Sequence, residues 1–312
     1  MNSLNYDLIG FILSLTNTKT IGKCLTINKY WKEIIENYSW MFRLDFSNNK
    51  KIMNCSLKYF KNIKNINLEG CNQITDQGLE YLKGIQTINL KDCNQITNQG
   101  LEYLKGVHTI NLNFCNKITD YGLKYLKGIH TIKLACCNQI TDKGLEYLKG
   151  VHLINLTDCK EITDYGLKYL KGVHTIILNG CGQITDAGLE YLKGVHTIEL
   201  ACCNRITDHG IEYLKGVHEI NLTLCSELTD QCCEFLKGVH TLDLFGCRKI
   251  TNVGLEYLKG VHTINLSFCF QITDQGLEYL KGVHMIRLDR KNTNITENGL
   301  KHLEGAKIYR QN

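Results

Sequence analysis

The chain has 312 residues, 43% hydrophobic and 21% charged, and this balance is typical of a folded globular protein and excludes disorder of the whole chain. A net charge of +5 is too small for this length to favour nucleic acid or an anionic membrane as a partner. The sixteen cysteines occur without a basic start, a cleavage site or a membrane-length apolar stretch, so we expect an intracellular, soluble protein with reduced thiols.

The first forty residues carry helical patterns. Apolar residues recur at helical spacing on both sides of a polar break at 16–19, first at Leu8, Ile9, Ile12 and Leu13 and then at Ile27, Trp31, Ile34 and Ile35. Forty residues of this kind are too few to form a core of their own. We therefore expect residues 1–40 to pack on the rest of the chain or on a partner.

This segment resembles the F-box, through its apolar residues at helical spacing and through Trp31 and Trp40 with apolar residues between them. Asn5 stands where the family usually has proline. The resemblance implies a small all-α module that binds a Skp-type adaptor. The adaptor-binding residues that it implies are Leu4, Leu8, Ile12, Leu13, Ile21, Leu25, Ile27, Trp31 and Ile34.

From residue 41 onward the sequence repeats every 22 residues, and residues 107–128 (VHTINLNFCNKITDYGLKYLKG) represent one unit. Apolar residues at its fourth and sixth positions predict a short strand, and the later Gly-Leu-x-x-Leu has helical spacing. Thr119 and Asp120 stand where an N-cap should be, and Lys127 and Gly128 are typical of a helix end. Each unit is therefore predicted to be a strand, a turn and a short helix.

We count twelve units over residues 41–305, followed by a C-terminal tail at 306–312. The first and last units, 41–62 and 283–305, are atypical, as capping repeats should be. Asn49 replaces the recurrent cysteine in the first unit, and Lys291 replaces it in the last, where one residue is inserted before Ile295. Because no unit can bury both its strand and its helix alone, stability must come from stacking of neighbours.

The repeat resembles the cysteine-containing form of the leucine-rich repeat, through the motif C-x-x-ITD-x-GL. The resemblance implies an α/β fold: a curved solenoid with a parallel sheet on its concave face and short helices on its convex face. Since the unit is shorter than is usual for this form, we expect helices of two turns or fewer.

An F-box followed by leucine-rich repeats implies the substrate receptor of an SCF-type (cullin–RING) ubiquitin ligase. The implied partners are a Skp-type adaptor, a cullin and a protein substrate. The alternative is a protein-binding scaffold without a ligase role, whose N-terminal helices only cap the solenoid. In both cases we expect no enzyme, no cofactor, no nucleic acid or membrane partner, and a monomer outside the complex.

Three columns of residues recur with the repeat. Single cysteines at 22-residue intervals cannot converge as zinc requires, so we expect a buried ladder and no metal site. The nine histidines from His108 to His284 suit the strand entrance; the alternative is a row that binds metal or senses pH. Protonation would then bring like charges together, and stability should fall as the pH drops through about 6. The lysines, each three residues after a glutamate in many units, predict a solvated helix face.

Positions of the concave face that vary between units are candidates for partner contact, because exposed aromatic residues close together are typical of partner surfaces. The alternative is that some of these side chains turn into the core. We expect the C-terminal half of this face to hold the substrate. The predicted substrate-binding residues, which include one earlier phenylalanine, are Phe114, Ile177, Leu224, Phe245, Phe268, Phe270 and Arg287. No combination of nucleophile and base stands out, so no catalytic residue is predicted.

Overall fold

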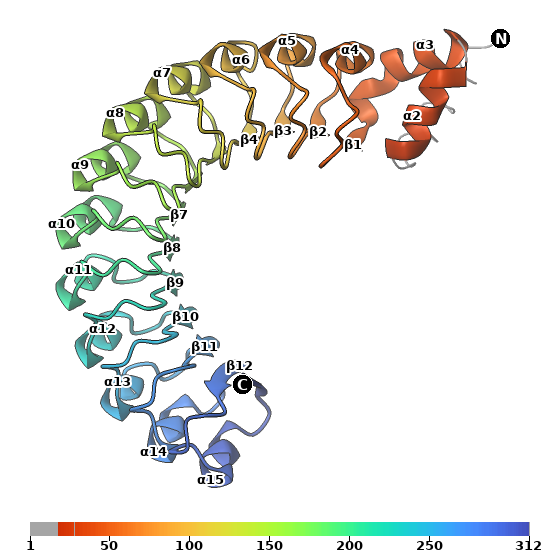
Figure 1. Ribbon diagram of the computed structural model, residues 1–312. Coiled ribbons are helices and arrows are strands. Elements are labelled where there is room, and N and C mark those ends of the chain that lie inside the picture. The colour runs from red at the N-terminus through yellow and green to blue at the C-terminus, as the bar shows by residue number, and fades with distance from the viewer. Residues whose placement is uncertain (1–17, 28, 312) are drawn as a thin grey trace. The chain divides into compact units, whose positions relative to one another are not determined.

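The computed structural model describes residues 18–27 and 29–311. The chain forms two compact units, Met1–Val151 and His152–Asn312. In each unit every coil of the repeat contributes one short strand and one short helix, with the strands on one side and the helices on the other (Figure 1). The side formed by the strands is called the strand face below.

In the first unit two longer helices precede the coils. The five strands of these coils pair in chain order, and all are parallel. The elements are α2 (Thr18–Ile27), α3 (Lys29–Tyr38), η1 (Ser39–Met41), β1 (Arg43–Asp45), α4 (Asn54–Leu57), η2 (Lys58–Phe60), β2 (Asn65–Asn67), α5 (Asp76–Leu79), η3 (Glu80–Leu82), β3 (Thr87–Asn89), α6 (Asn98–Glu102), β4 (Thr109–Asn111), α7 (Asp120–Leu123), η4 (Lys124–Leu126), β5 (Thr131–Lys133), α8 (Asp142–Leu145) and η5 (Glu146–Leu148).

The second unit continues the same alternation, and its eight strands are also parallel and in chain order. The elements are β6 (Leu153–Asn155), α9 (Asp164–Leu167), η6 (Lys168–Leu170), β7 (Thr175–Ile177), α10 (Asp186–Leu189), η7 (Glu190–Leu192), β8 (Thr197–Glu199), α11 (Asp208–Glu212), β9 (Glu219–Asn221), α12 (Asp230–Phe235), β10 (Thr241–Asp243), α13 (Asn252–Glu256), β11 (Thr263–Asn265), α14 (Asp274–Leu277), η8 (Glu278–Leu280), β12 (Met285–Asp289), α15 (Glu297–Leu300), η9 (Lys301–Leu303) and β13 (Lys307–Gln311).

The predicted solenoid of parallel strands and short helices is confirmed. Neighbouring strands stay in register at one repeat length, so that Ile198 lies opposite both Ile176 and Ile220. The helical segments of the coils are one to two turns long, as predicted. Surface lysines pair with glutamates three residues earlier, as Lys83 Nζ does with Glu80 Oε1 at 3.3 Å.

The cysteine column is a buried ladder, as predicted. Each thiol whose bond is resolved donates to a carbonyl of the previous coil, for example Cys181 Sγ to Leu156 O at 3.1 Å. Burial raises the pKa of the Cys93 and Cys115 thiols to about 12. The ladder therefore consists of neutral thiols that satisfy the carbonyls at the ends of the strands.

A second ladder joins the helix starts and uses the aspartate differently from our prediction. Thr119 caps its own helix by accepting from Tyr121 N at 3.3 Å. Asp120, in contrast, bonds to the next coil: its Oδ1 accepts from Thr141 N at 2.8 Å and its Oδ2 from Thr141 Oγ1 at 2.7 Å. We call this pair of bonds the Asp–Thr clamp. It recurs from coil to coil, with Asn replacing Asp at residues 54, 98 and 252.

The clamp explains the glycine two residues after most of the helix starts. A Cβ at Gly144 would collide with Asp120 Oδ1 and approach Leu123 Cδ1 to 3.0 Å. One coil has Cys232 at this place and Cys233 where the others have leucine or isoleucine, and both side chains are buried. The irregular coil nevertheless keeps its clamp, because Thr229 N and Thr229 Oγ1 donate to the two carboxylate oxygens of Asp208.

The C-terminal end differs from the sequence prediction in two ways. Residues 306–312, predicted as a tail, contain β13, which pairs with β12 over five residues with Ile308 opposite Ile286. This strand covers an edge of β12 whose backbone groups would otherwise lack partners. The ladder position of the last full coil belongs to Asn292 and not to Lys291: Asn292 is 3% exposed, and its Nδ2 donates to Ile272 O at 3.0 Å. The inserted residue therefore precedes the ladder position.

Candidate functional site: two protein-binding surfaces

The two N-terminal helices pack on the first coil. α3 lies against η1 and η2, and α2 lies beside β1, where Asp45 N donates to Thr18 Oγ1 at 2.8 Å. The helices α2 and α3, called the helical cap below, therefore close the start of the hydrophobic core.

The structure gives two of the predicted adaptor-binding residues another role. Ile21 and Ile34 are 1% and 0% exposed and belong to the core, because they sit on the inner faces of α2 and α3. Trp31 is half-buried, with its ring 6.1 Å from that of Tyr30. Of Leu25 and Ile27 only the backbone, in α2, is described. The remaining predicted residues, which lie outside the described residues, are Leu4, Leu8, Ile12 and Leu13.

Two large apolar side chains near the helical cap are exposed, Trp40 (54%) and Met53 (53%). The adaptor prediction did not include either of them. Trp40 had a signal in the sequence, since it belongs to the F-box-like pattern, but Met53 lies in the first repeat and its exposure depends on the packing of that coil. An exposed tryptophan is typical of a protein interface.

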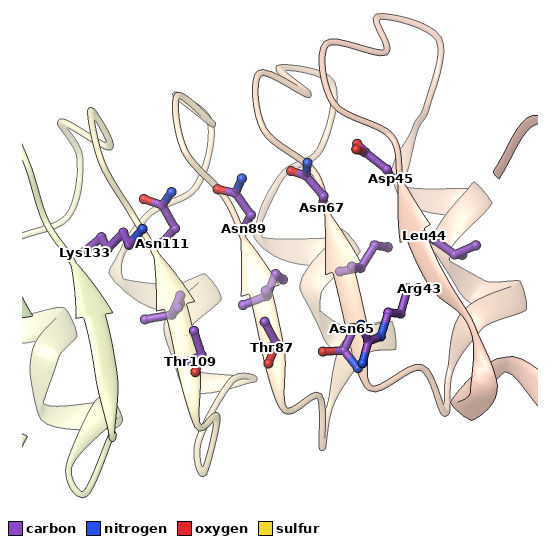
Figure 2. A pocket seen from close by; sticks show the side chains of 13 residues that line it. Arg43, Leu44, Asp45, Asn65, Asn67, Thr87, Asn89, Thr109, Asn111 and Lys133 are labelled. Atoms are coloured by element: carbon purple, nitrogen blue, oxygen red, sulfur yellow. The ribbon is translucent and has the colours of Figure 1, made fainter. Parts of the chain in front are cut away.

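The strand face of the first unit forms a shallow hollow of about 400 Å³, called the polar hollow because most of the residues that line it are polar. Figure 2 shows its side chains standing out from successive strands; one row consists of Asp45, Asn67, Asn89, Asn111 and Lys133. Asn89 Oδ1 accepts from Lys91 N at 3.0 Å and its Nδ2 donates to Glu69 Oε2 at 3.2 Å. Glu69 also pairs with Lys91 at 2.8 Å. This ordered polar surface suits contact with polar side chains of a partner.

The second unit carries an apolar cluster at the carboxyl ends of its strands. The rings of Phe245 and Phe268 have centroids 4.9 Å apart, and those of Phe268 and Phe270 are 5.9 Å apart in an edge-to-face arrangement. Leu224 extends over Gly246, where a Cβ would lie 2.6 Å from Leu224 Cδ2. Leu224 is 44% exposed and Phe270 38%. We define these four residues as the apolar cluster.

The backbone of the apolar cluster is itself unusual. Leu224 and Phe268 have φ angles of 58° and 63°, in the left-handed region. Other coils place residues that favour this region at the same position, such as Asp158 and Gly180. A large apolar side chain costs about 1 kcal/mol more there, and the exposed ones gain little core packing in return. The residues are therefore better explained by contact with a partner than by folding.

The other predicted substrate-binding residues do not join this cluster. Phe114 shares the left-handed backbone, with φ 64°, but lies in the first unit. Ile177 is half-buried on β7, and Arg287 is exposed on β12. Sequence reasoning missed Arg248, an exposed residue one repeat before Phe270 and at the same position of its coil. The repeat itself gave that signal, because equivalent positions in adjacent coils are neighbours.

Among residues 18–27 and 29–311 no group of three or more histidine, cysteine, aspartate or glutamate side chains could hold a metal ion. None of the helices in the same ranges is long and apolar enough to cross a membrane. The surfaces that remain as candidates for function are the apolar cluster, the polar hollow and the helical cap.

Comparison with known proteins identifies the repeat. A family model described as Leucine Rich repeat matches residues 61–83, 129–149 and 239–259. A chain of the yeast Rad7 and Elc1 complex has 16% identity and a TM-score of 0.55, and the match covers 97% of this chain and 93% of that one. An internalin (inlF) from Listeria monocytogenes has 20% identity and a TM-score of 0.57, with 81% of both chains covered.

A chain of the Drosophila Toll–Spatzle complex has 12% identity and a TM-score of 0.57, with 89% of this chain and 45% of that one covered. A search of the curated proteins finds no match. At these identities the likeness to solved structures concerns the fold alone. The repeats are leucine-rich repeats, and their solenoid is a fold that typically serves as a scaffold for protein–protein interaction.

Proposed function

We propose that this protein is the substrate receptor of an SCF-type ubiquitin ligase. The N-terminal helices bind a Skp-type adaptor, through which a cullin is reached, and the repeats bind a protein substrate. The observation that carries protein binding is the apolar cluster, which is partly exposed on coils that stacking and two hydrogen-bonded ladders hold in place. By holding both partners, the protein raises the effective concentration of the substrate near the ligase.

The apolar cluster has the properties of an interface centre. Its three aromatic rings already contact one another, so binding costs little further side-chain entropy. Two exposed arginines belong to neighbouring coils: Arg248 occupies the position of Phe270 one coil earlier, and Arg290 directly follows β12 in the coil after Phe270. Aromatic residues with a rim of arginine are enriched where binding energy concentrates.

Support for adaptor binding at the N-terminal end comes from the F-box-like pattern of residues 4–40 and from the helices α2 and α3, which do not belong to the repeat. Trp40 remains exposed beside them and offers apolar area to a partner. A yeast chain of similar fold, which this chain matches over 97% of its length, was solved in a two-protein complex. That complex is an example of a similar fold crystallised together with a second protein.

The test uses full-length protein in eukaryotic lysate, with immunoprecipitates probed for a Skp-type adaptor and a cullin. Leu8→Asp/Ile12→Asp should lose both, whereas Phe245→Ser/Phe268→Ser should keep both and lose ubiquitylated targets. Each variant thus serves as the control for the other, and circular dichroism checks that both are folded. Recovery of neither adaptor nor cullin by the unaltered protein would refute the ligase role.

The second candidate is a scaffold outside the ubiquitin pathway whose N-terminal helices are only a cap. The burial of Ile21 and Ile34 favours it, because these side chains close the core instead of meeting a partner. The same experiment distinguishes the two: a scaffold retains protein targets that depend on Phe245 and Phe268 but recovers no adaptor.

A further inference from the structure

Five histidines of the second unit form a column of stacked rings at the amino ends of its strands. In the second unit, the rings of His196, His218, His240, His262 and His284 follow one another with centroids 4.5–4.7 Å apart and planes inclined by 10–18°. The spacing matches that of neighbouring strands, about 4.8 Å. We call these five side chains the imidazole strip. The protein-binding function proposed above does not use it.

In three of the five rings, a hydrogen bond fixes which ring nitrogen points away from the strand. The Nδ1 atoms of His196, His240 and His262 lie 3.2–3.3 Å from the Oγ1 of the threonine that follows each. The opposite ring nitrogen, Nε2, is therefore directed away from the strand. His218 keeps 43% of its side chain exposed, and the rings of His196, His262 and His284 are exposed as well. The strip thus presents a regular row of ring nitrogens.

The charge of the strip depends on pH and on what faces it. Burial and then repulsion from His240 and His284 lower the pKa of His262. Glu219 is the acidic group that faces the strip, with Oε1 3.8 Å from His218 Nδ1. At the far end, Lys307 of β13 donates its backbone N–H to His284 O. Because adjacent imidazolium ions lie less than 5 Å apart, the free protein resists full protonation, and a bound anion would relieve that repulsion.

We propose that the imidazole strip is a proton-linked binding site for an acidic protein segment, a run of Asp or Glu side chains. Protonated Nε2–H groups donate to carboxylates, and the flexible acidic side chains adjust to the 4.5–4.7 Å spacing. Binding and protonation favour each other: the anion promotes uptake of protons, and acidification tightens binding. The strip therefore adds a pH-dependent contact to the leucine-rich scaffold.

Two other ligands fit the geometry less well. A metal ion needs ring nitrogens that converge at about 2.0–2.1 Å from it, whereas stacked rings direct their Nε2 atoms side by side. Single-stranded nucleic acid binds by stacking bases on aromatic faces. In the middle of the strip these faces already cover one another, with interplanar angles of 10° and 13° for the rings around His240.

The test measures the fluorescence anisotropy of a fluorescein-labelled deca-glutamate peptide with the full-length protein at pH 7.5, 6.5 and 5.5, at constant ionic strength. Net uptake of one proton should tighten binding by up to about tenfold per pH unit, so we expect at least about tenfold tighter binding at pH 5.5 than at pH 7.5. His218→Gln/His240→Gln/His262→Gln should abolish most of this gain. Glutamine suits the position, since Gln86 occupies it in an earlier coil.

The matched control is His209→Gln/His302→Gln, which removes histidines outside the column and should leave the pH dependence intact. In the unaltered protein, NMR titration of the histidine Cε1 protons should show higher pKa values with peptide than without it, a readout that needs no variant. Binding that does not respond to pH, or that responds equally in the triple variant, overturns the proposal. Equal or tighter binding of a deca-thymidylate would assign the strip to nucleic acid instead.

Discussion

The Asp–Thr clamp offers the sharpest test of how the coils hold together. In the second unit, Asp164 Oδ1 accepts from Thr185 N at 2.8 Å and Asp164 Oδ2 from Thr185 Oγ1 at 2.6 Å. Asp164→Ala removes both bonds and leaves the half-buried Thr185 amide and hydroxyl without this partner. Bonds to a charged group contribute about 1.5–3 kcal/mol each, and water replaces part of them at a half-exposed site, so we expect a loss of about 2–4 kcal/mol.

Asp164→Asn is the matched control. Asn98 already forms the same link in this protein, with Oδ1 accepting from Thr119 N at 3.0 Å and Nδ2 donating to Thr119 Oγ1 at 2.9 Å. The amide thus reverses one hydrogen bond but satisfies both groups. We therefore expect Asp164→Asn to cost less than about 1 kcal/mol, because no buried polar group is left unpaired.

The assay is urea unfolding followed by far-UV circular dichroism, together with hydrogen exchange around Thr185. Exchange is needed because coils of a repeat protein can open separately, so that a local loss may not appear in the global transition. Asp164→Ala should lower the midpoint and speed exchange at the start of α10. A loss below about 0.5 kcal/mol by both measurements, or equal damage from alanine and asparagine, would refute this account of the clamp.

Three further predictions follow from the ladders. In the native protein a thiol reagent should modify the exposed Cys55 and Cys202. It should reach ladder thiols such as Cys93 only after the protein unfolds, and rapid labelling of Cys93 in the native protein would contradict its burial. The melting temperature should fall as the pH decreases from 7 through 6.5. The reason is that His174 and His262 have lowered pKa values in the folded protein, so the unfolded chain takes up protons first. A melting temperature that stays flat down to pH 5.5 would show that protonation of the histidines does not destabilise the fold. Asn292→Ala should destabilise the last coils by about 1–3 kcal/mol, because two carbonyls of the preceding coil lose their donor. The control Lys291→Ala, at the exposed neighbouring residue, should leave the stability unchanged. Similar effects of both changes would contradict the assignment of Asn292 to the ladder.

The largest part of the fold could be predicted from the sequence, because it depends on periods within one coil. Two apolar residues at an interval of two, as at Ile176 and Leu178, mark a strand whose inner face is buried. Thr119 as an N-cap and Gly128, with φ 80°, as a helix end obey rules that involve only adjacent residues. The 22-residue recurrence then implies that all coils stack alike.

Tertiary structure decided what depends on residues about twenty or more positions apart. The partner of Asp120 is the threonine of the following coil, and no local rule distinguishes that bond from a cap on its own helix. The same holds for Ile21, whose burial requires the first coil to lie beneath it. Ile308 forms a strand because β12 offers an unpaired edge.

For the candidate binding surfaces, too, one part could be predicted from the sequence and another part required the structure. The sequence placed Leu224, Phe245 and Phe268 in consecutive coils and therefore close together. Only the structure showed that Leu224 and Phe268 project from left-handed backbone and that the two phenylalanine rings contact each other. Periodicity determines which face a side chain belongs to, whereas its exposure and its neighbours depend on how adjacent coils pack.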